Sequence, residues 1–227
     1  MAMRRIVLAL LSLIALAHPA MAHERVVIEE TIEVTEYVDE GGSERAVGMA
    51  PIALPKGIAR FGPFVVLDGT RAAMIDVTDS ASPAQFAAMV KAYPGIARIE
   101  MIDVPGTEDD RANLKLGRMI RARGMTTYVP AGGSVRSGGV ELFLAGERRI
   151  AEPGSEFAVH AWADEDGREA TDYAADAPEN RAYLDYYREM GLPDPQARAF
   201  YAMTNSVPFD DAKWLTAADM RQWVALD

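Results

Sequence analysis

Short apolar runs alternate with helical segments along most of this chain, and this alternation restricts its fold more than any other feature. Strands are predicted over 96–102 and 126–129, with a long helix over 109–121 between them. Asp109 suits the positive end of that helix dipole, and Gly124 suits the turn beyond its last residue. Repeated strand–helix units favour an α/β domain with a mostly parallel sheet, because parallel strands need a crossover connection that a helix usually supplies.

The pattern extends to both sides of this unit. The residues of 103–107 and the glycine-rich segment around Ser137 are predicted to be turns, and Ser82 is predicted to cap a helix. The other expected elements are a hairpin of 64–67 and 72–77, a helix from Ser82 through Val90, a helix over 139–145, a strand over 148–151, a strand ending at His160, an acidic loop over 164–178, and helices over 179–190, 194–204 and from about Thr216.

The N-terminus has the pattern of a secretory signal peptide. Arg4 and Arg5 precede the apolar segment 6–17, and Ala20-Met21-Ala22 follows it with small residues at its first and third positions. We therefore expect a signal peptide over 1–22, cleavage after Ala22, and a periplasmic or secreted location. The apolar segment is short for a membrane span, and no later segment approaches the length of about 18 residues that a span needs. We expect no membrane partner after processing.

The residues after the signal peptide are predicted to form an acidic N-terminal arm over 23–57. Apolar residues alternate with glutamates over 24–38, which indicates a strand or an extended arm with one charged face, and Gly41-Gly42 marks a turn. We place the boundary near Gly57, so that the folded domain comprises 58–227.

The composition excludes several classes of function. The formal net charge is −11, which disfavours nucleic acid as a partner because an acidic protein repels phosphates. The chain has no cysteine, which excludes disulfides, thiolate metal sites and cysteine nucleophiles. Of its three histidines, His18 lies in the signal peptide and His23 lies at the expected new N-terminus. With His160 as the one internal imidazole, we expect no metal site and no cofactor.

Ser137 and His160 are the candidate catalytic residues. Ser137 lies ahead of a predicted helix among Gly132, Gly133, Gly138 and Gly139, which permit tight turning and close approach of a substrate. The unpaired N–H groups at the start of that helix would stabilise an oxyanion. A serine needs a nearby base, and histidine is the usual base at neutral pH. The alternative is that Ser137 only caps the helix and that His160 is a satisfied core residue.

Two further segments could complete such a site. The turn Pro105-Gly106-Thr107 could supply a second oxyanion donor from its backbone N–H groups, or it could be an ordinary strand-to-helix turn. A carboxylate is needed to orient the histidine, and Asp210-Asp211 is a candidate. The chain has 34 acidic residues, so spacing alone does not select this pair.

Taken together, these segments resemble the proteolytic subunit of the Clp protease and, more broadly, the ClpP/crotonase superfamily. The similarity is in order and spacing: it runs from Pro105-Gly106 through Ser137-Gly138-Gly139 and the basic strand and proline turn over 148–155 to His160. It ends at 211–217, where an aspartate precedes an aromatic-Leu-Thr-Ala run. The resemblance covers about 62–220 and is strong over 100–162. It implies an α/β fold built as a spiral of strand–strand–helix units with a mostly parallel sheet, in an exported branch of the superfamily.

The resemblance also implies roles for individual residues. Ser137, His160 and Asp211 would be the catalytic triad. The oxyanion donors would be the N–H of Gly138 and one from Gly106 or Thr107. The family's Pro-Gly-Gly is Pro-Gly-Thr here, which leaves the second donor open. The aspartate lies one residue further from the aromatic residue than in the family, so that Asp210 is an alternative third member.

The implied activity is that of an exported serine hydrolase, an ATP-independent peptidase acting on peptides or small esters. A homo-oligomer is left open, although the acidic, tyrosine-rich insert between His160 and Pro208 is unlike the family's assembly region. The main alternative is a non-catalytic exported module of the same fold that binds a protein partner, for example through Tyr186. Two others are a Ser–Lys dyad with Lys115 and an acyl-CoA enzyme on the crotonase fold.

Overall fold

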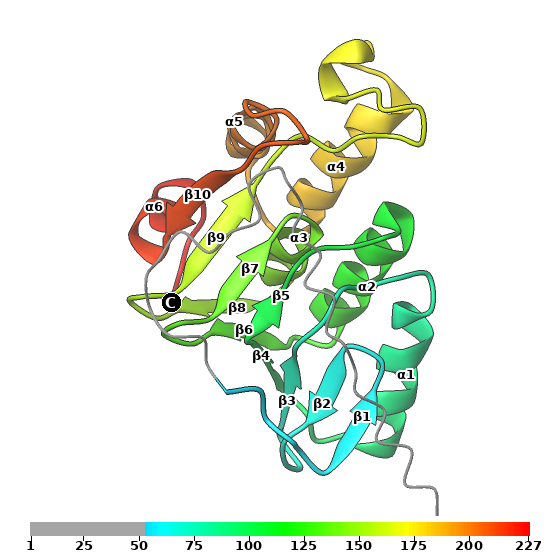
Figure 1. Cartoon of the computed structure of the whole chain (residues 1–227), viewed down its shortest axis with the longest axis vertical. Coiled ribbons are helices and arrows are strands. Elements are labelled where there is room, and N and C mark those ends of the chain that lie inside the picture. Colours follow the sequence, from blue (N-terminus) through cyan, green and yellow to red (C-terminus); the bar gives the residue numbers. More distant parts are fainter. Residues whose placement is uncertain (1–52) are drawn as a thin grey trace, which may run out of the picture. The chain divides into compact units, whose positions relative to one another are not determined.

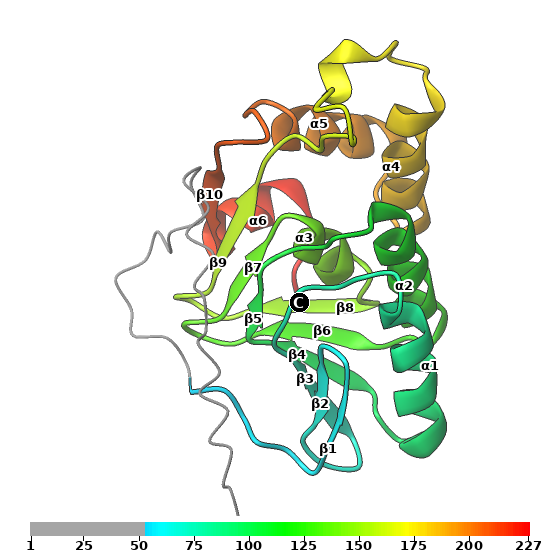
Figure 2. The same ribbon diagram turned by 45° about the vertical axis from the view of Figure 1, so that its right-hand side comes forward.

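The computed structural model describes residues 53–227, shown in Figures 1 and 2. The predicted signal peptide 1–22 and most of the predicted arm 23–57 lie outside the described residues, so both stay predictions. Among the described residues, no helix is both long enough and apolar enough to cross a membrane.

Two sheets and the helices beside them make up the described part of the chain (Figure 1). The elements in chain order are β1 (Ala59–Phe61), β2 (Phe64–Val66), β3 (Arg71–Met74), α1 (Ser82–Ala92), β4 (Arg98–Met101), β5 (Asp103–Val104), α2 (Asp110–Ala122), β6 (Thr126–Val129), β7 (Ser134–Arg136), α3 (Gly138–Leu144), β8 (Arg148–Ala151), β9 (Glu156–Val159), a 3₁₀ helix (Ala170–Asp172), α4 (Pro178–Glu189), α5 (Asp194–Thr204), β10 (Lys213–Thr216) and α6 (Ala217–Trp223).

The chain alternates between the two sheets in a regular way. The six-stranded sheet has the order β1-β2-β3-β4-β6-β8, and the four-stranded sheet has the order β10-β9-β7-β5. Thus β4, β6 and β8 join the first sheet, while β5, β7 and β9, which directly follow them, join the second. The pairs β3–β4, β4–β6, β6–β8, β5–β7 and β7–β9 are parallel. The predicted α/β fold with strand–strand–helix units and mostly parallel sheets is confirmed.

The helices bury the apolar face that these sheets offer them. α1 packs on α2, and α2 packs on α3 and α4, along one side of the described region (Figure 2). The ring of Phe86 on α1 lies 5.6 Å from the ring of Phe64 on β2. Phe143 on α3 lies 4.9 Å from Phe157 on β9, so α3 joins the core to the four-stranded sheet.

Several local predictions were wrong. Asp103-Val104 and Ser134–Arg136 form strands rather than turns, because each pairs in parallel with a neighbour in the four-stranded sheet. β10, which pairs antiparallel with β9, was missed. Ser82 is not the N-cap of α1, since Ala81 occupies that position, and the Ser82 hydroxyl instead donates to Asp79 Oδ1 at 2.8 Å.

The tyrosine-rich insert contributes to the core. Tyr186 is completely buried, and its hydroxyl donates to the Glu141 carbonyl at 2.6 Å. A side chain at Gly117 of α2 would collide with the Tyr186 ring, because a Cβ there would lie 1.9 Å from the hydroxyl oxygen. Tyr186 therefore fastens α4 to α2 and α3 and has no surface to offer a protein partner.

Candidate active site

The candidate residues follow the carboxyl ends of three neighbouring parallel strands. Gly106 comes shortly after β5, Ser137 directly after β7, and His160 directly after β9. β7 lies between β9 and β5 in the four-stranded sheet, so Ser137 is placed between the other two. The carboxyl edge of parallel strands is where α/β proteins usually bind ligands.

Ser137 has an unusual backbone conformation. Its φ of 47° is positive, and it is the only non-glycine residue with positive φ among residues 53–227. Its N–H donates to the Ala158 carbonyl of β9 at 2.9 Å, and α3 begins at the next residue. A serine held in a sparsely populated conformation between a strand and a helix is typical of an exposed nucleophile.

His160 has a defined tautomer. Its Nδ1 lies 2.8 Å from the Ala161 carbonyl oxygen. A carbonyl can only accept, so Nδ1 carries the hydrogen and Nε2 of the neutral ring keeps its lone pair. The Phe209 ring packs edge-on against the imidazole, with centroids 5.1 Å apart. The described residues therefore present an imidazole whose Nε2 can accept a proton.

Ser137 and His160 line the same cavity, which has a volume of about 180 Å³. Thr107 and Gly138 also line it, and they come from the segments expected to supply oxyanion donors. The structure thus brings together the candidate nucleophile, the candidate base and both donor segments.

The backbone around Ser137 leaves several N–H groups free. Within residues 53–227, no acceptor hydrogen-bonds to the N–H of Gly106, Thr107 or Gly138. A side chain at Gly138 would collide with Thr107, because its Cβ would lie 2.6 Å from Cγ2. The close approach of these two segments therefore requires glycine at 138, and it gathers donors where an oxyanion would form.

A buried polar network that the sequence analysis missed holds these two segments in place. Asn113 of α2 donates from Nδ2 to the Gly138 carbonyl at 2.7 Å. Thr78 donates its hydroxyl to Asn113 Oδ1 at 2.9 Å and its N–H to the Gly106 carbonyl at 3.1 Å. Asn113 and Thr78 are both buried, so they position the serine turn and the Gly106 turn together. In the sequence, an amide on the apolar face of the long helix signals a buried polar contact at Asn113 but does not identify its partners.

The two candidate aspartates lie at the same sheet edge as His160. β10 begins at Lys213, which pairs with Val159, so Asp210 and Asp211 precede β10 beside the end of β9. Both are exposed, and Asp211 Oδ1 accepts from the N–H of Ala212 at 2.7 Å. The contact found at His160 Nδ1 is with the Ala161 carbonyl.

Three other carboxyls, which sequence reasoning did not single out, line the cavity: those of Glu108, Asp110 and Glu141. Burial raises the pKa of Glu141 from 4.5 to about 7, although the Tyr187 hydroxyl donates to Oε1 at 2.7 Å. Asp110 is an exposed residue that lines the cavity together with Tyr183. Loss of hydration raises its pKa, and Tyr183 and His160 act in the opposite direction.

Other arrangements find less support. Lys115 is exposed on α2 and is not among the residues that line the cavity, so a Ser–Lys dyad has no geometry in its favour. Among the described residues, no group of three or more His, Cys, Asp or Glu side chains could hold a metal ion.

No protein-family model matches the chain, and no curated protein matches it. Among solved structures, it is similar to the 1510-N membrane protease specific for a stomatin homolog from Pyrococcus horikoshii, at 13% identity and a TM-score of 0.45 over 70% of each chain. It is also similar to a variant of ClpP1 from Listeria monocytogenes, at 16% identity and a TM-score of 0.46, over 68% of this chain and 87% of that one. The α/β architecture described above rests on the strand pairing of this chain itself.

Proposed function

We propose that this chain is a serine hydrolase, acting as an ATP-independent peptidase, with Ser137 as nucleophile and His160 as base. One observation carries the proposal: the only non-glycine residue of 53–227 with positive φ is a serine, and it shares a cavity with an imidazole whose Nδ1 hydrogen is held by a carbonyl. A base within reach activates a serine hydroxyl by accepting its proton, and a strained turn between a strand and a helix exposes that hydroxyl to substrate.

The reaction would proceed through an acyl-enzyme. His160 Nε2 accepts the proton of Ser137 Oγ as this oxygen attacks the substrate carbonyl carbon. The N–H groups of Gly138 and of Gly106 or Thr107 donate to the resulting oxyanion. The leaving amine or alcohol takes the proton from Nε2, and a water molecule, deprotonated by the same nitrogen, then releases the acyl group and restores Ser137.

We propose Asp211 as the third member, with Asp210 as the alternative. The position of both residues beside the end of β9 supports a carboxylate near His160. Because the Ala161 carbonyl already fixes the tautomer, the carboxylate would mainly stabilise the imidazolium. Asp211→Asn should then lower kcat/KM about tenfold, or about 1.4 kcal/mol, and Asp210→Asn should change it less than about twofold.

The biological setting follows from the N-terminal sequence. With a signal peptide over 1–22, the mature protein would act in the periplasm or outside the cell, in an exported branch of the ClpP/crotonase superfamily. Those compartments lack the ATP that would drive an unfoldase. The substrates would therefore be peptides, unfolded chains or small esters.

The test is hydrolysis of an unfolded protein and of an activated ester by the chain beginning at His23. Ser137→Ala should lower both activities by about 10³-fold or more. Ser155→Ala is the matched control, since Ser155 is buried elsewhere and its hydroxyl has no hydrogen-bond partner among the described residues. A folded protein that hydrolyses neither substrate would favour the non-catalytic binding module, and hydrolysis that persists in Ser137→Ala would place the nucleophile elsewhere.

A further inference from the structure

The cavity beside Ser137 is rich in hydrogen-bond acceptors and, among the described residues, is lined by no Lys or Arg side chain. Its lining includes the carboxyls of Glu108, Asp110 and Glu141. A ligand group that fits such walls is a donor or a cation, because an anion or a bare acceptor would be repelled.

Glu141 lies deep in this cavity, in the first turn of α3, which begins directly after Ser137. Its side chain is 8% exposed, and the Tyr187 hydroxyl donates to one of its oxygens. Asp110, at the start of α2, lines the same cavity beside Tyr183. Neither carboxyl forms an ion pair with Lys or Arg in the part of the chain that the structure describes.

Aromatic rings form the remaining wall. The rings of Trp162 and Tyr183 are stacked, with centroids 6.2 Å apart and an angle of 9° between planes. Tyr201 also stacks on Tyr183, at 6.0 Å, and its hydroxyl accepts a hydrogen bond from Trp162 Nε1 at 2.7 Å. Stacked rings beside carboxyls are surfaces to which ammonium and guanidinium groups bind.

An unsatisfied acceptor lies on the same wall. Asn205 Oδ1 is inaccessible to solvent and has no hydrogen-bond partner within residues 53–227, although Asn205 Nδ2 donates to the Tyr201 carbonyl at 2.8 Å. Asn205 lines the cavity, but an oxygen that solvent does not reach is closed to a ligand donor as well, so the preference for a cation rests on the carboxyls and the rings.

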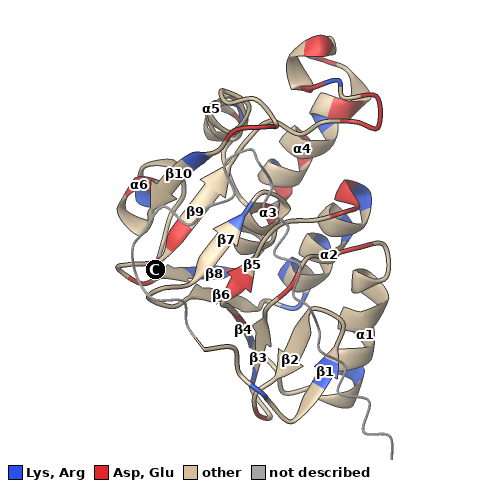
Figure 3. Cartoon of the chain, viewed as in Figure 1, with Lys and Arg blue, Asp and Glu red and all other residues tan. Residues whose placement is uncertain are grey.

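The cavity continues into an open, acidic groove of about 970 Å³, with which it shares Glu108, Asp110 and Tyr183. Figure 3 shows Asp and Glu gathered in the loop before α4 and near the start of α2, which supply most of the groove's residues. Its three basic residues are Arg111, Arg118 and Arg168, and Arg118 is paired with Glu189.

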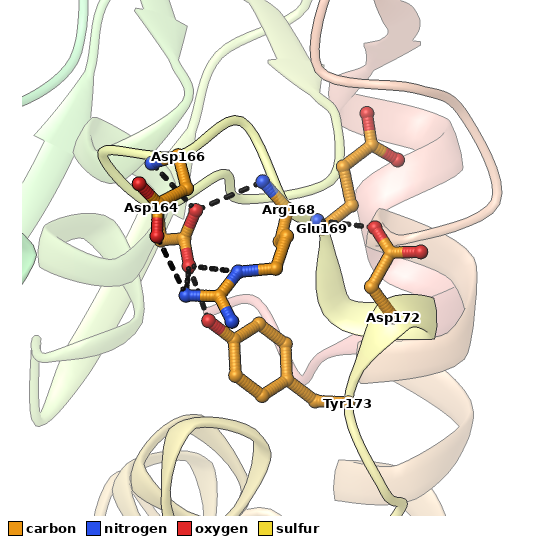
Figure 4. A network of polar contacts seen from close by, with 6 residues as sticks. All are labelled: Asp164, Asp166, Arg168, Glu169, Asp172 and Tyr173. Atoms are coloured by element: carbon orange, nitrogen blue, oxygen red, sulfur yellow. Dashed lines mark hydrogen bonds and ion pairs between the residues drawn. The ribbon is translucent and has the colours of Figure 1, made fainter.

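Arg168 is neutralised inside its own loop, as Figure 4 shows. Its guanidinium lies 2.8 Å from Asp164 and 3.0 Å from Asp166, and it covers the Tyr173 ring. Tyr173 in turn donates its hydroxyl to Asp164. The groove therefore stays acidic along the loop that adjoins the cavity.

We propose that the cavity is a specificity subsite for a lysine or arginine side chain next to the bond that is cleaved, with Glu141 and Asp110 as its carboxylate partners. This inference rests on the proposed hydrolase function and names its substrate class, a basic peptide or a basic amino-acid ester. A cavity of about 180 Å³ is smaller than the roughly 300 Å³ at which pockets for drug-sized ligands begin, and it suits one side chain.

The test compares esters of N-acetyl-lysine, N-acetyl-norleucine and N-acetyl-glutamate, because norleucine keeps the lysine chain and lacks the ammonium group. A fluorophosphonate probe counts the reactive serines in each preparation. We expect kcat/KM for the lysine ester to exceed that for the norleucine ester by about tenfold or more, and the glutamate ester to be the poorest substrate.

Substitution of the carboxyls should reduce the lysine-to-norleucine ratio. At pH 8, where Glu141 is ionised, we expect Glu141→Gln to lower it by about tenfold, since a hydrogen-bonded charge contact is lost. Asp110→Asn, on the exposed first turn of α2, should also lower the lysine-to-norleucine ratio. It provides the test if Glu141→Gln does not fold. Glu147→Gln removes the same charge after the end of α3, outside the cavity, and should leave the ratio as it is.

The outcomes separate the two proposals. The subsite is wrong if labelled, active protein hydrolyses the lysine and norleucine esters equally. It is also wrong if both carboxyl variants keep the preference for lysine. In either case the proposed hydrolase function is unaffected. Protein in which Ser137 neither reacts with the probe nor supports hydrolysis of any ester would overturn the hydrolase, and the subsite with it.

Discussion

The two sheets are built from the same strand–strand–helix units, yet they differ in what their strands carry. In the six-stranded sheet, Met74, Ile99 and Met101 are completely buried. In the four-stranded sheet, β5 has two residues and β7 has three, and the turns after them carry Gly106 and Ser137. Both sheets supply the apolar core, since Val135 of β7 and Phe157 of β9 are also completely buried. The four-stranded sheet in addition presents backbone N–H groups and reactive side chains where its strands end.

The largest effect should come from the four-stranded sheet. His160→Ala removes the base that the site offers to Ser137, and we expect kcat/KM for an activated ester to fall by about 10³-fold or more. His160 is only partly buried, so circular dichroism should show a melting temperature close to that of the unsubstituted chain. A variant that keeps more than about a tenth of the activity would show that His160 is not the base, and that the four-stranded sheet does not supply it.

The six-stranded sheet should respond in the opposite way. Met101→Ala opens a cavity in a completely buried position of β4, and we expect the free energy of unfolding to fall by about 2–5 kcal/mol. Urea unfolding measures this loss. Well below the melting temperature, the folded variant should keep its kcat/KM. If activity were lost while stability held, the division of labour between the sheets would be wrong.

Glu141 links stability to the site, because it is a titratable group that is buried in the core and lines the cavity beside Ser137. Its pKa is about 7 when folded and near 4.5 when unfolded, so between these values the folded chain holds a proton that the unfolded chain has lost. Stability should therefore fall as the pH rises from 4.5 to 7, by about 3 kcal/mol from this group.

Glu141→Gln should remove this slope. Urea unfolding measures this. The unfolding free energy of the variant minus that of the unsubstituted chain should be about 3 kcal/mol larger at pH 8 than at pH 5. Glu147→Gln, whose carboxyl is exposed, is the matched control and should show no such gain. An equal difference between Glu141→Gln and the unsubstituted chain at both pH values would mean that the carboxyl is not desolvated.

The smallest effect should come from the loop beyond both sheets. Arg168→Gln breaks the ion pairs with Asp164 and Asp166, which are solvent-exposed in part. Exposed pairs contribute little to stability, so we expect the urea midpoint of unfolding to stay close to that of the unsubstituted chain. A midpoint lowered as far as in Met101→Ala would show that this loop is part of the folding core.

The sequence predicts the long elements and misses the short ones. The helix around Leu116 and the strand Thr126–Val129 have clear periodicity and apolar content, and both are found where they were expected. β5, β7 and β10 lack such a signal. The chain forms them because a neighbouring strand is already in place, and a local pattern cannot report that pairing.

The site divides in the same manner. Ser137 and His160 are conspicuous in sequence because the chain lacks cysteine and has no other histidine in residues 53–227, and the structure places both in one cavity. The sequence does not predict that the Ala161 carbonyl is the partner of His160 Nδ1. It also does not predict that Asn113 and Thr78 hold the serine turn and the Gly106 turn together. These contacts depend on backbone carbonyls brought together from distant parts of the chain.

The measurement that tests the central claim most directly is fluorophosphonate labelling of the chain beginning at His23, with the modified residue identified by mass spectrometry. The account predicts one adduct, on Ser137, formed at neutral pH and lost in His160→Ala. An adduct on another residue, or a folded protein that forms none, would contradict it.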